Sequence, residues 1–84
     1  MQELESIVNE YCDNAMAHIH AELPELPYDD TVLLCYIYAG FSAKAIHLFT
    51  KNSISNIYSR KSRLREHIKQ SDAPHRQQLL DMMP

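Results

Sequence analysis

Residues 54–69, ISNIYSRKSRLREHIK, constrain the fold most, because their apolar side chains recur at helical spacing. At about 100° per residue, Ile57, Leu64 and Ile68 fall on one narrow face, and Ile54 lies close to it. The polar residues fall on the opposite face: Ser55, Ser59, Ser62, Arg63 and Glu66. Ser53 precedes the stretch, where a hydroxyl can cap the free amides of a first helical turn. The pattern therefore predicts an amphipathic helix.

This predicted helix is also strongly basic, with cations at Arg60, Lys61, Arg63, Arg65 and Lys69. Residues 1–43 carry eight acids and no Lys or Arg, whereas residues 44–69 carry seven bases and one acid, although the net charge is −3. Such asymmetry between the halves of a chain suggests an anion-binding surface. The alternative is that the acidic half neutralises the basic half inside the fold.

Length and composition limit the architecture to one small helical domain. A chain of 84 residues has material for a single, marginal core. One glycine and no alternating apolar runs between turn signals favour an all-α fold over a β fold. Cys12 and Cys35 lack the spacing of a zinc site, so we expect buried free thiols in a reducing compartment. No stretch is typical of a signal peptide or a membrane span, which favours a cytoplasmic protein.

The N-terminal segment, residues 1–23, is predicted to form one long amphipathic helix. It contains no Gly or Pro before Pro24, and apolar residues such as Leu4, Val8 and Ile19 recur with a helical period. This helix either packs on its own domain or continues an upstream connecting helix or pairs with a partner protomer. Asp29 or Asp30 is then expected to cap the next helix.

The middle of the chain, residues 24–69, has the order of a helix-turn-helix unit. An apolar helix to about residue 39 is predicted to be buried on several sides, and Gly40 to end it in the left-handed conformation. Ser42 is expected to cap a short helix to about residue 49, and a tight polar turn leads into the basic helix. This order predicts a helix-turn-helix DNA-binding domain.

The C-terminal segment, residues 70–84, is predicted to form a final short helix. Asp72 is expected to cap it and Pro74 to occupy its first turn. Its apolar side consists of Leu79, Leu80, Met82 and Met83. We expect this side to cover the core or to face a second protomer.

The run Gly40-Phe41-Ser42-Ala43-Lys44-Ala45-Ile46, followed by Ile57, Leu64 and Ile68, resembles the LuxR-type (GerE-like) helix-turn-helix. The chain departs from that pattern at Val32, Thr50 and Glu66. The resemblance implies a small four-helix DNA-binding module of bacterial transcription regulators, often C-terminal to a sensor or receiver domain. It also implies a homodimer formed by the last helix. By position in the motif, Lys44 would contact phosphate, and Tyr58, Ser59 and Ser62 would reach base edges.

The residue types support the same division of roles. Long cations position a protein on phosphates, whereas short polar or aromatic groups can approach base edges. The expected phosphate contacts are Lys44, Arg63 and Lys69, and the expected base contacts are Ser55, Tyr58, Ser59 and Ser62. Lys61 lies near the apolar stripe and is expected to extend along it or to pair with an acid. The predicted function is a regulator domain that places residues 54–69 in the major groove of double-stranded DNA.

Two other functions fit the same pattern. A protein-interaction module with this fold would dock on RNA polymerase or on an upstream sensor domain, and a domain like sigma-factor region four would bind DNA within a larger assembly. An enzyme is not expected, because His18 and His20 point to different helix faces and His47, His67 and His75 stand apart in the sequence. For the same reason, neither a metal nor another cofactor is expected.

Overall fold

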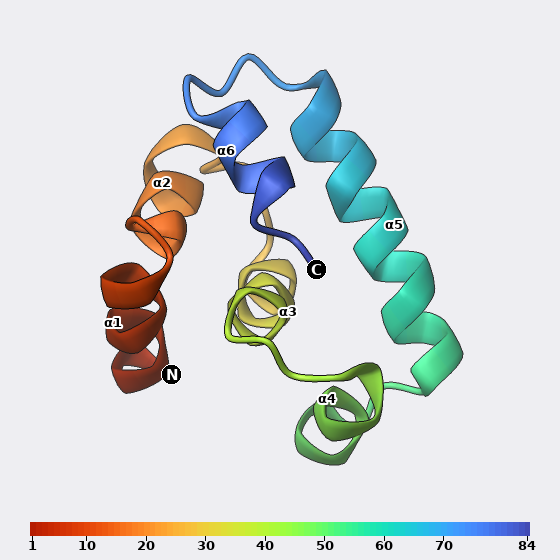
Figure 1. The fold of residues 1–84 in the computed structure, drawn as a ribbon. Coiled ribbons are helices and arrows are strands. Elements are labelled where there is room, and N and C mark those ends of the chain that lie inside the picture. Colours follow the sequence, from red (N-terminus) through yellow and green to blue (C-terminus); the bar gives the residue numbers. More distant parts are fainter.

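The computed structural model describes all 84 residues and contains helices without any strand. The all-α expectation is therefore confirmed. Figure 1 shows the six helices in chain order, α1 (Gln2–Tyr11), α2 (Ala15–Glu22), α3 (Tyr28–Tyr38), α4 (Ala43–Thr50), α5 (Ile54–Gln70) and α6 (Arg76–Asp81). None of them is long and apolar enough to cross a membrane.

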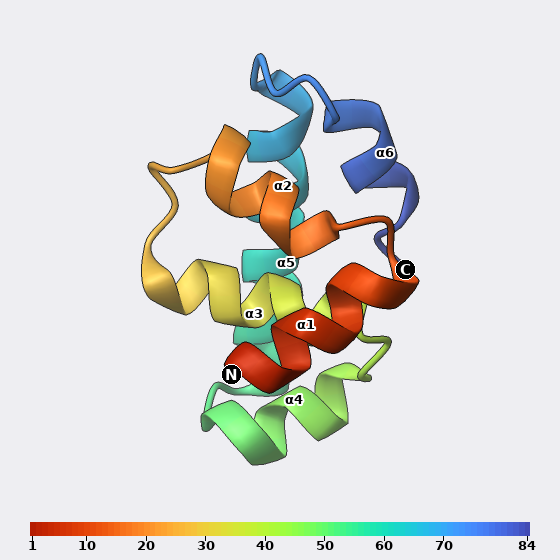
Figure 2. The ribbon, with the colours of Figure 1, turned by 90° about the vertical axis from the view of Figure 1, so that its left-hand side faces the viewer.

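Helix α3 lies in the middle of the molecule. In Figure 1, α1 and α2 lie on one side of it and α5 on the other, and in Figure 2 α4 runs below it. Its side chains are buried in most directions, as the nearly continuous apolar sequence predicts: Leu33, Leu34, Cys35, Ile37 and Tyr38. The hydroxyl of Tyr38 donates a hydrogen bond of 2.9 Å to the carbonyl of Leu79, which ties α3 to α6.

The prediction of one continuous helix over residues 2–23 is wrong. The chain turns between α1 and α2, where Asp13 and Asn14 adopt φ angles of 50° and 61°. Asp and Asn tolerate this left-handed conformation better than most residues. They can therefore form the turn without a Gly or Pro that would mark a break in the sequence. A straight helix of this length would extend about 33 Å. The longest dimension of the molecule is only 32 Å, so the break brings both halves onto one core.

The remaining turns form largely as the sequence predicts. Gly40 has φ of +88°, the left-handed conformation expected after α3. The hydroxyl of Ser42 accepts a hydrogen bond from the amide of Ala45 at 3.2 Å, and that of Ser53 accepts one from Asn56 at 3.0 Å. Both predicted caps are confirmed.

Two predicted caps are wrong. Helix α3 begins at Tyr28 after the extended Pro27, so Asp29 and Asp30 lie within its first turn instead of before it. Helix α6 begins at Arg76, not near Asp72, and its preceding residue His75 makes no side-chain cap. Instead, the amide of His75 donates a hydrogen bond of 2.9 Å to the carboxylate of Glu22 on α2. A side chain from a distant helix therefore satisfies a free amide that a local cap was expected to bind.

The C-terminal helix contributes to the core. Leu79, Leu80 and Met83 are buried, and Met82 is half-buried. Both cysteines are free, as predicted. Cys35 is buried as expected, whereas Cys12 lies only half-buried just after α1. Burial raises the pKa of the Cys35 thiol to about 11, so this thiol stays protonated and is a poor nucleophile.

Candidate nucleic-acid interface

Helices α4 and α5 cross each other and are joined by a short turn. In Figure 1, α4 is seen nearly end-on at the foot of the molecule, while α5 runs along the right-hand edge. Lys51 makes the turn with φ of 62°, and Ser53 then caps α5. The ring of His47 donates from Nδ1 to the carbonyl of Asn52 at 2.5 Å, and Thr50 donates to the carbonyl of Ile46 at 2.9 Å. The first bond ties the turn to α4, and the second closes the last turn of α4.

One side of α5 anchors it to the core. Ile57, Leu64 and Ile68 are buried, which confirms the predicted apolar face. Ile54, predicted close to this face, is 42% exposed because it lies at the very start of the helix. Since the other helices lie on one side of α5 in Figure 1, the anchored face fixes which side chains point outward.

The predicted DNA contacts all lie on the surface. Each of the seven is exposed, and none of their side chains forms a hydrogen bond or an ion pair within the chain: Lys44, Ser55, Tyr58, Ser59, Ser62, Arg63 and Lys69. At about 100° per residue, the three serines share the middle of the outward face of α5. Arg63 lies on one flank, where it lines a hollow with Glu25 and Asp30. Tyr58 lies on the other flank, beside Lys61 and Arg65.

Two of the seven bases in residues 44–69 are held by contacts within the fold. Arg60 Nη2 lies 2.6 Å from Asp30 Oδ1, an ion pair between α5 and α3. Arg65 Nη1 lies 3.4 Å from the carbonyl oxygen of Leu80 on α6. The other five make no ion pair with an acidic residue: Lys44, Lys51, Lys61, Arg63 and Lys69. The acidic half of the chain therefore neutralises only part of the basic half.

Lys61 is half-buried and has no acidic partner, so the expected pairing does not form. Its stem lies among apolar neighbours such as Ile57 and Pro84, in keeping with the expected path along the apolar stripe. Lys51 was not among the predicted contacts, although it is an exposed cation in the turn between the two crossing helices. In the sequence it stands two residues before Ser53, the predicted cap of the basic helix.

Acidic groups border the interface at two places. Glu66 is exposed on the outward face and accepts a hydrogen bond of 2.8 Å from Gln70. Glu25, on the connection before α3, lies 2.7 Å from Nε2 of His67. The hydrogen bond from His67 lowers the pKa of the Glu25 carboxyl below its ordinary value of 4.5. Negative charge thus limits the electrostatic attraction of this face for phosphate.

The structure also joins residues that stand apart in the sequence. The ring of His75 stacks on that of His18, with centroids 3.7 Å apart, and both rings approach the carboxylate of Glu22. His75 stands apart from the other histidines in the sequence, but the fold brings it against His18. No spacing rule connects residues 18 and 75, because the contact depends on how α6 returns to α2.

No known protein family, curated protein or solved structure shows a significant match to the chain. The likeness to LuxR-type domains thus rests on the motif residues quoted from the sequence.

Proposed function

We propose that this chain binds duplex DNA with α5 in the major groove, as the effector domain of a transcription regulator. The observation that carries the proposal is the outward face of α5. This face is polar and exposed, and Glu66 is the only one of its residues whose side chain has a partner within the chain. Three buried residues anchor the opposite face. A major groove about 12 Å wide admits a helix of about 10–12 Å diameter.

The positions of the side chains suggest their roles. Ser55, Tyr58 and Ser59 lie in the N-terminal half of α5, the part of a recognition helix that contacts base edges. Lys44 lies in the first turn of α4, and Lys51 lies in the turn before α5. As exposed cations next to the proposed groove-binding helix, both suit phosphate contacts, together with Arg63 and Lys69.

The charge distribution predicts weak binding by a single chain. Cations that are free to neutralise phosphates release counterions from DNA, which drives binding. The negative charge of Glu66 on the same face repels phosphate and weakens this effect. We expect a dissociation constant in the non-specific range of about 10⁻⁴–10⁻⁶ M at physiological salt. A homodimer would bind a palindromic site more tightly by engaging two half-sites.

Fluorescence anisotropy with a labelled random-sequence duplex tests the proposal. Binding should be detected at low salt. Glu66→Gln should tighten it, because the change removes a negative charge that repels phosphate. The matched control is Glu3→Gln, which removes an exposed acid from α1 on the far side of the molecule. Absence of binding at low salt would refute the proposal, and an equal gain for both variants would place the interface elsewhere.

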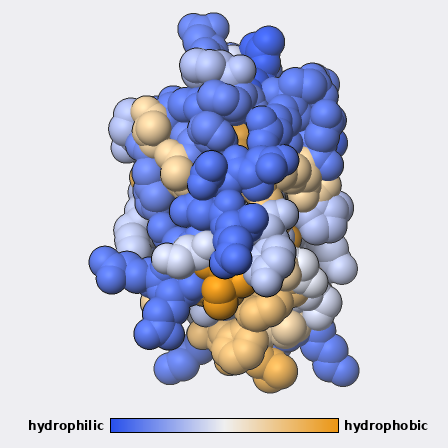
Figure 3. Space-filling model, turned by 60° about the vertical axis from the view of Figure 1, so that its left-hand side comes forward, coloured by the Kyte–Doolittle hydropathy of each residue, from blue (hydrophilic) through white to orange (hydrophobic).

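A second candidate function is protein docking through α4. Leu48 and Phe49 are 74% and 63% exposed, and Figure 3 shows apolar side chains gathered at the foot of the molecule, where α4 lies. At this patch the ring centroids of Tyr36, Phe41 and Phe49 lie within 5.8 Å of one another. Exposed apolar patches often mark protein contacts. If the Leu48→Asp variant lost binding to a protein partner but retained DNA binding, this second function would be supported.

A further inference from the structure

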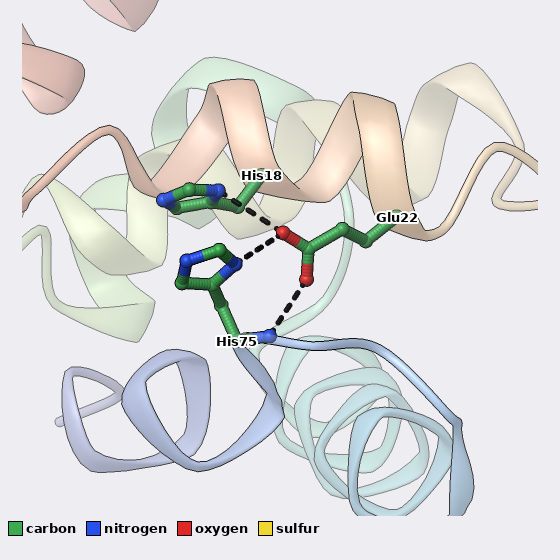
Figure 4. Close-up of side chains that lie close together, drawn as sticks. All are labelled: His18, Glu22 and His75. Carbon is green, nitrogen blue, oxygen red and sulfur yellow. Dashed lines mark hydrogen bonds and ion pairs between the residues drawn. The ribbon is translucent and has the colours of Figure 1, made fainter.

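Two histidines and a glutamate converge beside the start of α6 (Figure 4). His18 and Glu22 lie one turn apart on α2, and His75 directly precedes α6. Nδ1 of His18 lies 3.1 Å from Oε2 of Glu22, and Nδ1 of His75 lies 2.5 Å from the same oxygen. One ligand atom from each of the three residues lies within 4.8 Å of the other two.

The hydrogen bonds hold this set in a fixed arrangement. One carboxylate oxygen, Oε2, accepts from the ring of His75 and also lies 3.1 Å from Nδ1 of His18, and the other, Oε1, accepts from the amide of His75 at 2.9 Å. Because the two rings stack with an interplanar angle of 19°, their Nδ1 atoms are presented to the same point. The Nε2 atoms of both rings have no protein partner, so each ring can move its proton to Nε2 and leave Nδ1 free to bind a cation.

The carboxylate of Glu22 supplies the acidic donor of this set. Its side chain is only 10% exposed and is held by the amide and the ring of His75. The ring of His75 remains open to solvent, which leaves an entry path.

We propose that His18, Glu22 and His75 form a binding site for a divalent transition-metal ion of the zinc type. Two imidazoles and one carboxylate are a known donor set for zinc and leave a fourth position for water. Metal–ligand bonds of about 2.0–2.2 Å place tetrahedral ligand atoms about 3.4 Å apart. Shifts of about 1 Å would bring the three atoms to that spacing. Imidazole ligands select against Mg²⁺ and Ca²⁺, which prefer oxygen.

Bound metal would replace the hydrogen-bonded protons as the link between α2 and the segment that leads into α6. It would therefore fasten the C-terminal helix to the N-terminal half of the chain. The site lies across the molecule from the outward face of α5, so metal binding is independent of the proposed DNA contacts.

Isothermal titration of the untagged, chelator-treated chain with ZnCl₂ tests the site. We expect one zinc ion to bind per chain and to raise the melting temperature. His75→Ala and His18→Ala should each weaken binding by at least about tenfold, since even outer-shell changes cost about 10–100-fold. The matched control is His67→Ala, which removes a histidine that pairs with a single carboxylate, 2.7 Å away.

Three results would overturn the proposal: no zinc binding by the wild-type chain, equal affinity in all four proteins, or loss of binding only in His67→Ala. Circular dichroism of each variant without metal shows whether it remains helical. If His75→Ala does not fold, His18→Ala decides the outcome, because its backbone stays in the middle of α2.

Discussion

Arg60 and Asp30 form an ion pair of 2.6 Å that joins the middle of α5 to the first turn of α3. Both side chains are largely shielded from water. One cation of the basic helix therefore stabilises the fold instead of facing a ligand. The neighbouring Arg63, three residues on, has no such partner.

This difference predicts opposite behaviour for the two arginines. Arg60→Ala should lower the free energy of unfolding by about 1–2 kcal/mol, between the values for exposed pairs and for charge-assisted hydrogen bonds. Arg63→Ala should change it by less than about 0.5 kcal/mol, as for surface sites generally. Urea unfolding of both variants measures this. Equal destabilisation by the two changes would show that the ion pair contributes nothing specific.

Leu64 should be essential for the position of α5. It is 5% exposed and lies centrally on the anchored face. Leu64→Ala should cost about 2–5 kcal/mol, a large share of the roughly 4–13 kcal/mol expected for a domain of this size. Ile54→Ala, on the same helix, is the control and should cost far less. A loss below about 1 kcal/mol for Leu64→Ala in chemical denaturation would mean that α5 is packed differently.

Tyr58 should influence sequence preference more than affinity. Its exposed ring lies near the N-terminal end of α5, where recognition helices meet base edges. Tyr58→Ala should therefore flatten the differences in affinity across a panel of duplexes. Tyr11→Ala removes a ring from α1 that is more exposed, 79% against 61% for Tyr58, and should leave the panel unchanged. An equal loss on every duplex would exclude base contact by Tyr58.

The carboxylate of Glu22 should make stability depend on pH in the acid range. Although burial raises its pKa, the hydrogen bonds from His75 and the charges of His75 and His18 lower it overall, so ionised Glu22 stabilises the folded chain. This contribution is present above about pH 4.5 and is lost as the pH falls through the lower pKa of the folded state. Urea unfolding at several pH values should show that the free energy of unfolding falls more steeply with decreasing pH for the wild type than for Glu22→Gln. Parallel pH profiles would contradict this role.

Local rules predicted much of the fold. Gly40, Ser42 and Ser53 act through neighbours within three residues, so their roles follow from the sequence alone. The buried face of α5 follows from helical periodicity in the same way. The break at Asp13 and Asn14 does not, because the apolar period continues across it and only the size of the core requires the turn.

Contacts between distant segments were beyond such rules. The pairs Arg60–Asp30 and His75–Glu22 join residues 30 and 53 positions apart, and their formation depends on how the helices pack. The sequence thus predicted which side chains of α5 point outward, but not which cations remain free. It also gave no sign of the histidine pair: Glu22 follows His18 at i+4 on one helix, but nothing in the sequence connects His75 with them.

The most direct test of DNA binding by α5 is the salt dependence of binding for the wild type and Arg63→Ala. The logarithm of the binding constant for a random duplex should fall linearly with the logarithm of salt concentration, by about 0.9 per phosphate contact. Arg63→Ala should reduce that slope by about 1 while the variant stays folded. Binding that ignores salt, or equal slopes for both proteins, would contradict a phosphate-contacting role for this face.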